Sequence, residues 1–156
     1  MSFDIEAALN GLAALVGTIP AMESVQIGAP ESLSVRISAW VTIGDPGVVE
    51  PRVTGVYDMP VNLVCWFGYA VEGSEQASEA QLADWLSELV RRTIQNRAET
   101  VTGNSLTVTR NLNGSVDRME LPQAAAGTAD YTLMAGLEVR TFPVAIRIVQ
   151  RENFGV

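Results

Sequence analysis

The sequence predicts a single α+β domain over residues 1–156, in which a mixed, mainly antiparallel β-sheet is flanked by two main helices. Apolar residues recur at intervals of three and four over 2–17 and 75–97, which is the period of an amphipathic helix. They alternate strictly with polar residues over 33–43, which is the period of a strand. A Pro- and Gly-rich stretch at 44–60 predicts a protruding hairpin or a long loop.

The first helix is expected at 2–17, with Ser2 as its N-cap and with Gly17 and Pro20 ending it. Its apolar side chains fall on one face, so we expect the helix to pack against the sheet. In the strand at 33–43, the odd-numbered residues form the face expected in the core. The other face is polar apart from Trp40.

Trp40 and Arg36 share the face of this strand that is expected to contact water. Tryptophan and arginine are favoured at the centres of protein interfaces, so both residues are candidates for an interface. The alternative is that Trp40 is an ordinary, half-exposed side chain.

The next strand, 61–71, is apolar on both faces, which predicts a central position in the sheet. Cys65 lies inside it and is expected to be a buried, unreactive thiol. The second main helix is expected at 75–97 with Ser74 as its N-cap. Its predicted buried stripe consists of Leu82, Trp85, Leu86, Leu89, Val90 and Ile94.

The C-terminal third predicts further strands. Residues 105–121 read as a hairpin that turns at Asn113-Gly114, a strong two-residue turn signal. The small residues of 123–130 predict a flexible segment that orders on contact with a partner. Residues 131–151 form a very long β stretch, in which Pro143 indicates an edge strand or a bulge.

The composition argues against an enzyme. The chain has no His and no Lys, and Cys65 is its one cysteine, so catalysis would depend on carboxylates and hydroxyls. The paired carboxylates, Glu75 with Glu79 and Asp84 with Glu88, lie on a solvated helix face, and no buried carboxylate is expected. We therefore expect no catalytic site, cofactor or metal.

Charge and hydropathy narrow the possible partners. The net charge of −8 disfavours tight binding of nucleic acid through a basic face. No window reaches the ~18 apolar residues that a membrane span needs, and the N-terminus lacks the pattern of a secretory signal. We expect a protein that is soluble and cytoplasmic when made.

The order of the elements resembles that of the tail terminator and neck (tail completion) proteins of long-tailed bacteriophages. The resemblance is carried by the helix at 3–16, by the apolar strand 61–67 leading into the helix of 74–97, and by the closing run 131–140. It implies a structural virion protein of the tail or neck, made in the host cytoplasm, that forms a ring, commonly a hexamer. Such a ring caps the tail tube, stops its polymerisation and offers a surface to the head–tail connector.

The resemblance also implies that DNA passes through the ring without specific binding and that no membrane is involved. The loops at 44–60 and 122–130 and the strand edges would supply contacts between subunits and with the tail tube protein. The candidate interface residues are Arg36, Trp40, Asp45, Val48, Glu50, Arg52, Tyr57, Gln123, Thr128, Asp130 and Arg140.

Three other functions fit the sequence. A head-completion or connector adaptor of the neck would form a ring without controlling tail length. A non-viral small-ligand-binding module would use Trp40 with Arg36, or Trp66, as its pocket. A carboxylate-only hydrolase would depend on one Asp or Glu that the sequence does not identify.

Overall fold

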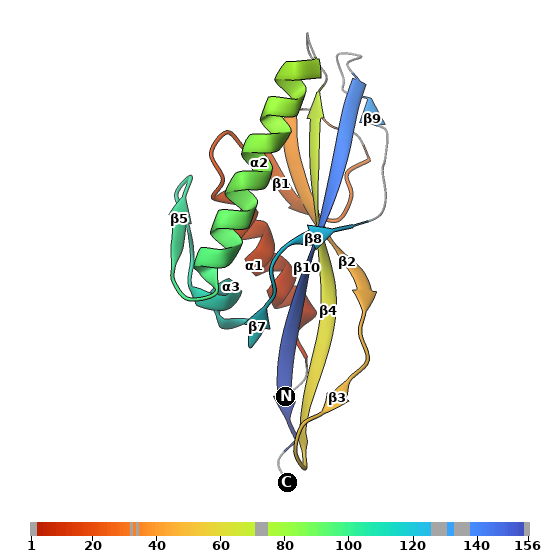
Figure 1. The fold of residues 1–156 in the computed structure, drawn as a ribbon, viewed down its shortest axis with the longest axis vertical. Helices are drawn as coiled ribbons and strands as arrows, with labels where there is room; N and C mark the ends of the chain where they lie inside the picture. Colours follow the sequence, from red (N-terminus) through yellow and green to blue (C-terminus); the bar gives the residue numbers. More distant parts are fainter. Residues whose placement is uncertain are drawn as a thin grey trace.

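The computed structural model describes residues 3–31, 33, 35–70, 75–125, 131–132 and 138–154. It has the predicted mixed α+β architecture, with a mainly antiparallel main sheet. The strand order is β1 (Ser24–Ile27), β2 (Ile37–Pro46), β4 (Val56–Ala70), β10 (Glu138–Asn153) and β7 (Arg118–Met119). Figure 1 shows the long sheet with the helices α1 (Ile5–Gly17) and α2 (Glu75–Asn96) on one side of it. Helix residues such as Leu12 and Leu89 share a buried core with Leu63 and Ile146 of the sheet, so the two helices cover the same face.

Helix α1 spans Ile5–Gly17 and ends where predicted, but it begins later than expected. Its N-cap is Asp4, whose carboxylate accepts a hydrogen bond from the Ala7 backbone N–H at 3.0 Å. The prediction of Ser2 as the N-cap is therefore wrong. An aspartate at this position satisfies a free N–H of the first turn as well as a serine does.

The centre of the sheet is formed by three strands. The β2 strand (Ile37–Pro46) pairs with the short parallel strand β1 (Ser24–Ile27) on one side and with antiparallel β4 (Val56–Ala70) on the other. The β10 strand (Glu138–Asn153) pairs with β4 in one unbroken register, from Val139–Ala70 to Asn153–Val56. The predicted central position of the 61–71 strand is confirmed, although this strand begins five residues earlier.

The second face of the sheet carries its own small core, which corrects the prediction for Trp40. This side chain is only 2% exposed and packs with Leu33, Ala70 and Val139. Its ring stacks on Trp66, with 6.2 Å between centroids. A Cβ at residue 68 would lie 2.9 Å from the Trp40 ring, so Gly68 makes room for it.

Helix α2 spans Glu75–Asn96, close to the predicted range, while Ser74 lies outside the described residues. Its buried positions are Trp85, Leu89, Thr93 and Asn96. The Trp85 ring stacks on Phe67 at 4.7 Å, which sets the rotation of the helix about its axis. The predicted stripe is therefore wrong on one side, where Leu86 is half-buried and Val90 and Ile94 are exposed.

The hairpin predicted around Asn113-Gly114 is absent from the described chain, and a different hairpin replaces it. The β5 (Val101–Gly103) and β6 (Leu106–Val108) strands pair through a turn at Asn104 and Ser105, with φ values of 49° and 62°. Positive φ at both central residues is typical of a type I′ turn.

The Asn113-Gly114 pair lies instead in the short element α3 (Arg110–Gly114), where residues 111–113 have φ between 53° and 62°. The buried Asn96 side chain holds this left-handed turn. Its Nδ2 donates to the carbonyls of Val108 and Thr109 at 3.1 and 3.0 Å, and its Oδ1 accepts from the Leu112 N–H at 2.9 Å. These side-chain bonds outweigh the local preference for a hairpin turn.

Three two-residue strands pair with the outer edge of β10: β7 (Arg118–Met119), β8 (Gln123–Ala124) and β9 (Tyr131–Thr132). The predicted bulge at Pro143 is wrong, because β10 keeps its register with β4 through this residue. β10 is not an edge strand of the sheet, but no described strand pairs with its outer edge at Pro143 itself. Pro143 falls between the stretches paired with β9 and β8, so its missing N–H interrupts neither. Residues 126–130 of the predicted flexible segment lie outside the described residues.

The remaining short strand is β3 (Glu50–Pro51), which pairs with β4. It confirms that the 44–60 stretch folds back on the sheet as a hairpin. No described helix is both long and apolar enough to cross a membrane.

Leu89→Asp is expected to unfold the domain, at a cost above about 4 kcal/mol, because an unpaired charge would enter the core at a fully buried position. Leu86→Asp is expected to destabilise it less, because that side chain is half-buried. Thermal melts followed by circular dichroism compare the two variants. An equal loss for both would show that the rotation of α2 described above is wrong.

Candidate assembly interface

The sheet continues past the helices as a narrow projection (Figure 1). We call this projection the arm and define it as residues 44–60 together with 150–154, which are the end of β10 and the residue that follows it. It contains the end of β2, all of β3, the first part of β4 and the end of β10. Five of the predicted interface residues lie on it: Asp45, Val48, Glu50, Arg52 and Tyr57.

The backbone of the arm is closed by hydrogen bonds at both of its bends. The Gly47 N–H donates to the Pro60 carbonyl at 2.7 Å, and a Cβ on Gly47 would lie 2.5 Å from the Pro60 ring. At the tip, Gly55 has φ 79° and its carbonyl accepts from the Phe154 N–H at 2.7 Å. The two glycines therefore allow a tight projection that larger residues would disrupt.

A buried carboxylate joins the strands of the arm. Asp58 is 1% exposed and lies on β4. Its Oδ1 accepts from Arg151 Nε of β10 at 2.8 Å, and its Oδ2 accepts from Arg52 Nε, just after β3. The Arg151 backbone N–H in turn donates to the Asp117 carboxylate. One carboxylate thus ties β4 to the segment that follows β3 and to the distant strand β10.

The two guanidinium groups determine the charge state of Asp58. The hydrogen bond from Arg151 is the largest influence, and together with Arg52 it outweighs the effect of burial and lowers the pKa of Asp58 to about 2. The pKa of Arg151 is raised in turn by Asp58. Asp58 is therefore ionised at neutral pH and cannot act as a general acid there.

The burial of Asp58 shows that the expectation of no buried carboxylate is wrong. Glu152, the neighbour of Arg151 on β10, is a second buried carboxylate and is only 3% exposed. Cys65 is buried, as predicted, and burial raises the pKa of its thiol. Among the residues that the structure describes, no group of His, Cys, Asp or Glu side chains could hold a metal ion.

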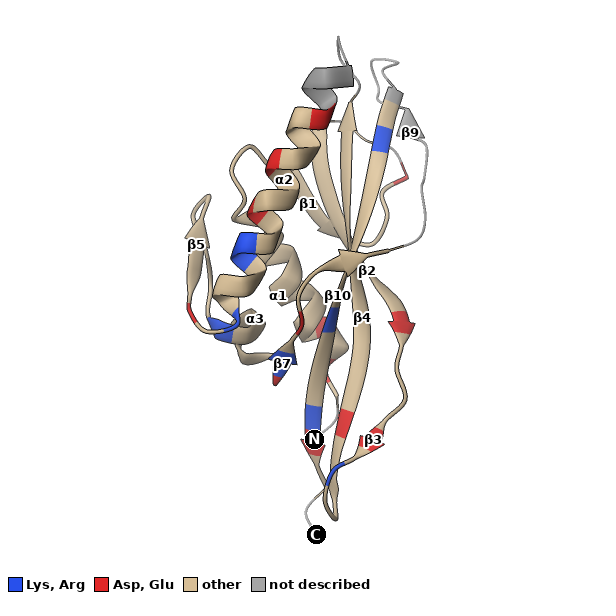
Figure 2. Cartoon of the chain, in the orientation of Figure 1, with Lys and Arg blue, Asp and Glu red and all other residues tan. Residues whose placement is uncertain are grey.

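The arm exposes apolar side chains. At its tip, Val53 is 68% exposed and Phe154 57%, and Val48, next to the Gly47 bend at the other end of the arm, is 81% exposed. The Phe154 ring also makes an edge-on contact with Tyr57, with 5.6 Å between centroids. Large apolar residues gathered at one exposed site are typical of a surface that a partner covers. Figure 2 shows that acidic and basic residues lie along the strands near this tip.

The other predicted interface residues are not gathered on the arm. Arg36 and Arg140 lie at the opposite end of the sheet, since the Arg36 carbonyl bonds the Ala70 N–H and Arg140 pairs with Tyr69. Gln123 is exposed on β8. Trp40 is in the core, as described above, and Thr128 and Asp130 lie outside the described residues.

Sequence reasoning missed Asp58, Val53, Phe154 and Arg151. Asp58 carried no period signal, because it alternates with Pro60 and Asn62 and not with the apolar residues Val61 and Leu63, and its contact with Arg151 follows only from the strand pairing. Phe154 lies near the end of the chain, where no period marks it as part of a surface.

No protein-family model matches the chain, and no curated protein matches it in sequence.

Asp58→Asn is expected to destabilise the protein by about 1–3 kcal/mol at pH 7, because it weakens two charge-assisted hydrogen bonds. The pKa of Asp58 is lowered in the fold, so its contribution is complete above the unfolded pKa of about 4. It is lost as pH falls through about 2. Thermal midpoints between pH 2 and pH 7 should therefore converge for wild type and variant at the acidic end.

Glu50→Gln is the matched control, because Glu50 is an exposed carboxylate of the same arm. Its melting profile should follow that of the wild type at every pH. If Asp58→Asn also followed the wild type, the three-segment clamp would contribute nothing to stability.

Proposed function

We propose that this chain is a non-enzymatic structural protein of the virion, a tail terminator of a long-tailed bacteriophage. In this role, copies form a ring, commonly of six, on the last ring of the tail tube. The ring stops polymerisation of the tube and provides the surface that joins the head. The observation that carries the proposal is the arm, a stiff projection with exposed apolar residues at its tip.

The construction of the arm supports a role in assembly. Because backbone hydrogen bonds and the Asp58 clamp order the arm in advance, little conformational entropy would be lost when it docks. If the arm of one copy docks on a different part of the next copy, the two copies contribute different surfaces, and the contact is heterologous. Heterologous contacts generate closed rings when the rotation between copies closes.

The charge of the chain is consistent with a ring through which DNA passes. Each copy carries a net charge of −8, so a ring of six would be strongly acidic. An acidic lumen repels the phosphate backbone and lets the DNA move without sticking. A ring of head–tail connector adaptors would also have an acidic lumen. The length of the tails in a mutant phage distinguishes the two roles.

The direct test is a phage with an early stop codon in this gene, with tails measured by electron microscopy of the lysate. We expect overlong, irregular tubes that are detached from heads. Tails of normal length that fail to join heads would place the protein on the connector side of the neck. Intact infectious particles would contradict a virion role altogether.

Val53→Asp, supplied in trans to the same mutant phage, is expected not to restore normal tail length, because it places a charge on the apolar tip of the arm. Leu121→Asp is the matched control, since Leu121 is a half-exposed leucine outside the arm, and it should restore normal tails. Both purified variants should keep the thermal midpoint of the wild type. Full rescue by Val53→Asp would exclude the arm tip as an assembly contact.

A further inference from the structure

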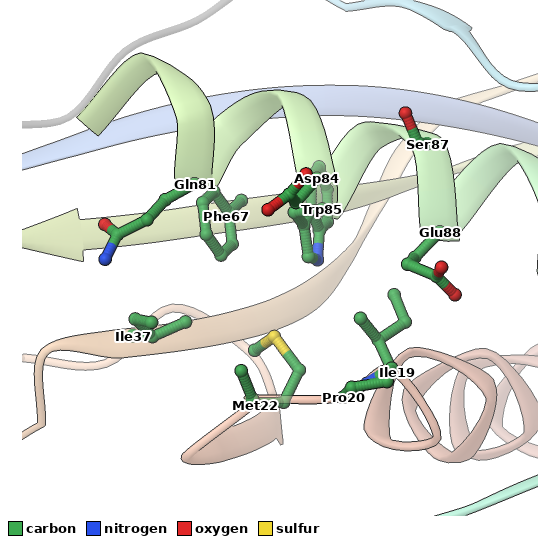
Figure 3. Close-up of a pocket in the computed structure, with 11 residues that line it drawn as sticks. Ile19, Pro20, Met22, Ile37, Phe67, Gln81, Asp84, Trp85, Ser87 and Glu88 are labelled. Carbon is green, nitrogen blue, oxygen red and sulfur yellow. The ribbon is translucent and has the colours of Figure 1, made fainter. Parts of the chain in front are cut away.

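The two flanks of helix α2 have different surroundings. Figure 3 shows Trp85 and Glu88 on the flank that faces the turn after α1, where both line a pocket. Arg92 donates to Glu88 at 3.1 Å and to Thr18 Oγ1, at the end of α1, at 3.0 Å. This flank is therefore engaged within the chain, and the opposite flank is the one left for contact with another molecule.

A straight row of side chains runs along the opposite flank. Its members follow one another at intervals of four, three, four and seven residues, which keeps them on one line of a helix. Leu86 is half-buried, Val90 is 40% exposed, and the other members are exposed. We call this set the α2 row, and it consists of Glu79, Ala83, Leu86, Val90 and Arg97, the residue that follows α2.

The α2 row is symmetric about residue 88. Glu79 and Arg97 lie nine residues before and after this point, and Leu86 and Val90 lie two residues before and after it. If a second α2 lies antiparallel with its residue 88 at the same level, each Glu79 faces Arg97 of the other copy, and each Leu86 faces Val90. The helix dipole favours acidic before basic residues in any helix, but it does not place apolar residues around the same midpoint.

The charged ends of the row select the antiparallel orientation. Among the described residues, neither Glu79 nor Arg97 has an ion-pair partner. Figure 2 shows acidic residues in the first half of α2 and basic residues in its second half, so a parallel pair would bring like charges together. The two ends are about 27 Å apart, and antiparallel helices that cross at about 20° stay close enough over that length for long side chains to meet.

The middle of the α2 row has the shape of a site for a facing helix. Four residues have the spacing i, i+3, i+4 and i+7, which is that of the residues around a hole in knobs-into-holes packing: Ala83, Leu86, Ser87 and Val90. Ala83 and Ser87 are small, and the helix surface is hollowed beside Ser87. In the antiparallel arrangement centred on residue 88, the side chain that faces this hole is Val90 of the other copy.

We propose that two copies of this chain pair through the α2 row as an antiparallel, two-fold dimer. Val90 of each copy fills the hole of the other, and Glu79 of each copy bonds Arg97 of the other. A two-fold contact closes after two copies, so the dimer is a state of the free protein and not a unit of the proposed ring. The α2 row includes no residue of the arm, so the inference does not rest on the proposed virion function.

The experiment is sedimentation equilibrium of the full chain. One helix face per copy makes a small interface, below the about 1,200 Å² of total buried surface that stable complexes exceed, so we expect a weak dimer with a Kd of about 50–500 μM. Between about 10 μM and about 1 mM, the average mass should rise from that of one chain toward that of two. The Val53→Asp variant, which is altered in the arm, should dimerise equally.

Exchange of the two charges tests the two-fold arrangement. Glu79→Arg and Arg97→Glu should each weaken the dimer about tenfold, because each variant opposes like charges at both ends of the row. A one-to-one mixture of the two variants should dimerise as the wild type does, because both ends of the mixed dimer then pair opposite charges.

Val90→Asp tests the apolar centre of the row. It should leave the chain monomeric at about 1 mM, because each dimer would hold two carboxylates between its helices. Gln95→Asp is the matched control, an exposed residue of α2 outside the row, and should leave the dimer unchanged. Both positions are exposed, so far-ultraviolet circular dichroism should show the wild-type fold for both variants.

Three results would overturn the proposal. They are a single-chain mass at every concentration, a mixture of Glu79→Arg and Arg97→Glu that associates no better than either variant alone, or association that Val53→Asp abolishes. The last result would assign the contact to the arm.

Discussion

The pairing of β4 with β10 is the constraint on which the rest of the structure depends. It runs in one register from Val139–Ala70 to Asn153–Val56, between strands that are far apart in the sequence. The longer part of this ladder carries the core beneath α1 and α2, and its far end forms the arm. Because the backbone hydrogen bonds continue from the core into the arm, the direction of the arm follows from the position of the helices.

Asp58 makes this register specific. Its position opposite Arg151 is fixed by the pairing, and a slip of one residue would turn the carboxylate to the other face and away from its cations. Buried ion pairs add little net stability compared with apolar residues, and their best-attested use is to select one register or partner. The clamp at Asp58 fits that use, and it orders the strands that carry the exposed tip residues Val53 and Phe154.

Period and composition were sufficient to predict much of the fold, including both main helices, the central strand and the hairpin at 44–60. The errors arise where distant residues decide a local structure. The alternating pattern distinguishes the two faces of β2, but it does not predict that Leu33 packs with Trp40 on the second face. The turn predicted at Asn113-Gly114 does not form, because the buried side-chain amide of Asn96 holds this segment in another conformation. Within the candidate interface, the loop of the arm was predictable from its prolines and glycines. The contact between Asp58 and Arg151 was not predictable, because the two residues meet only through the pairing of β4 with β10.

The central claim is that the arm is the contact through which copies of this chain assemble. The most direct measurement is the structure of the assembled tail end, determined by electron cryomicroscopy. In that structure, we expect Val48, Val53 and Phe154 to be covered by a neighbouring subunit, with the Asp58 clamp in the geometry described above. A closed ring in which the arm tip remains exposed to solvent, with subunits joined through other surfaces, would contradict it.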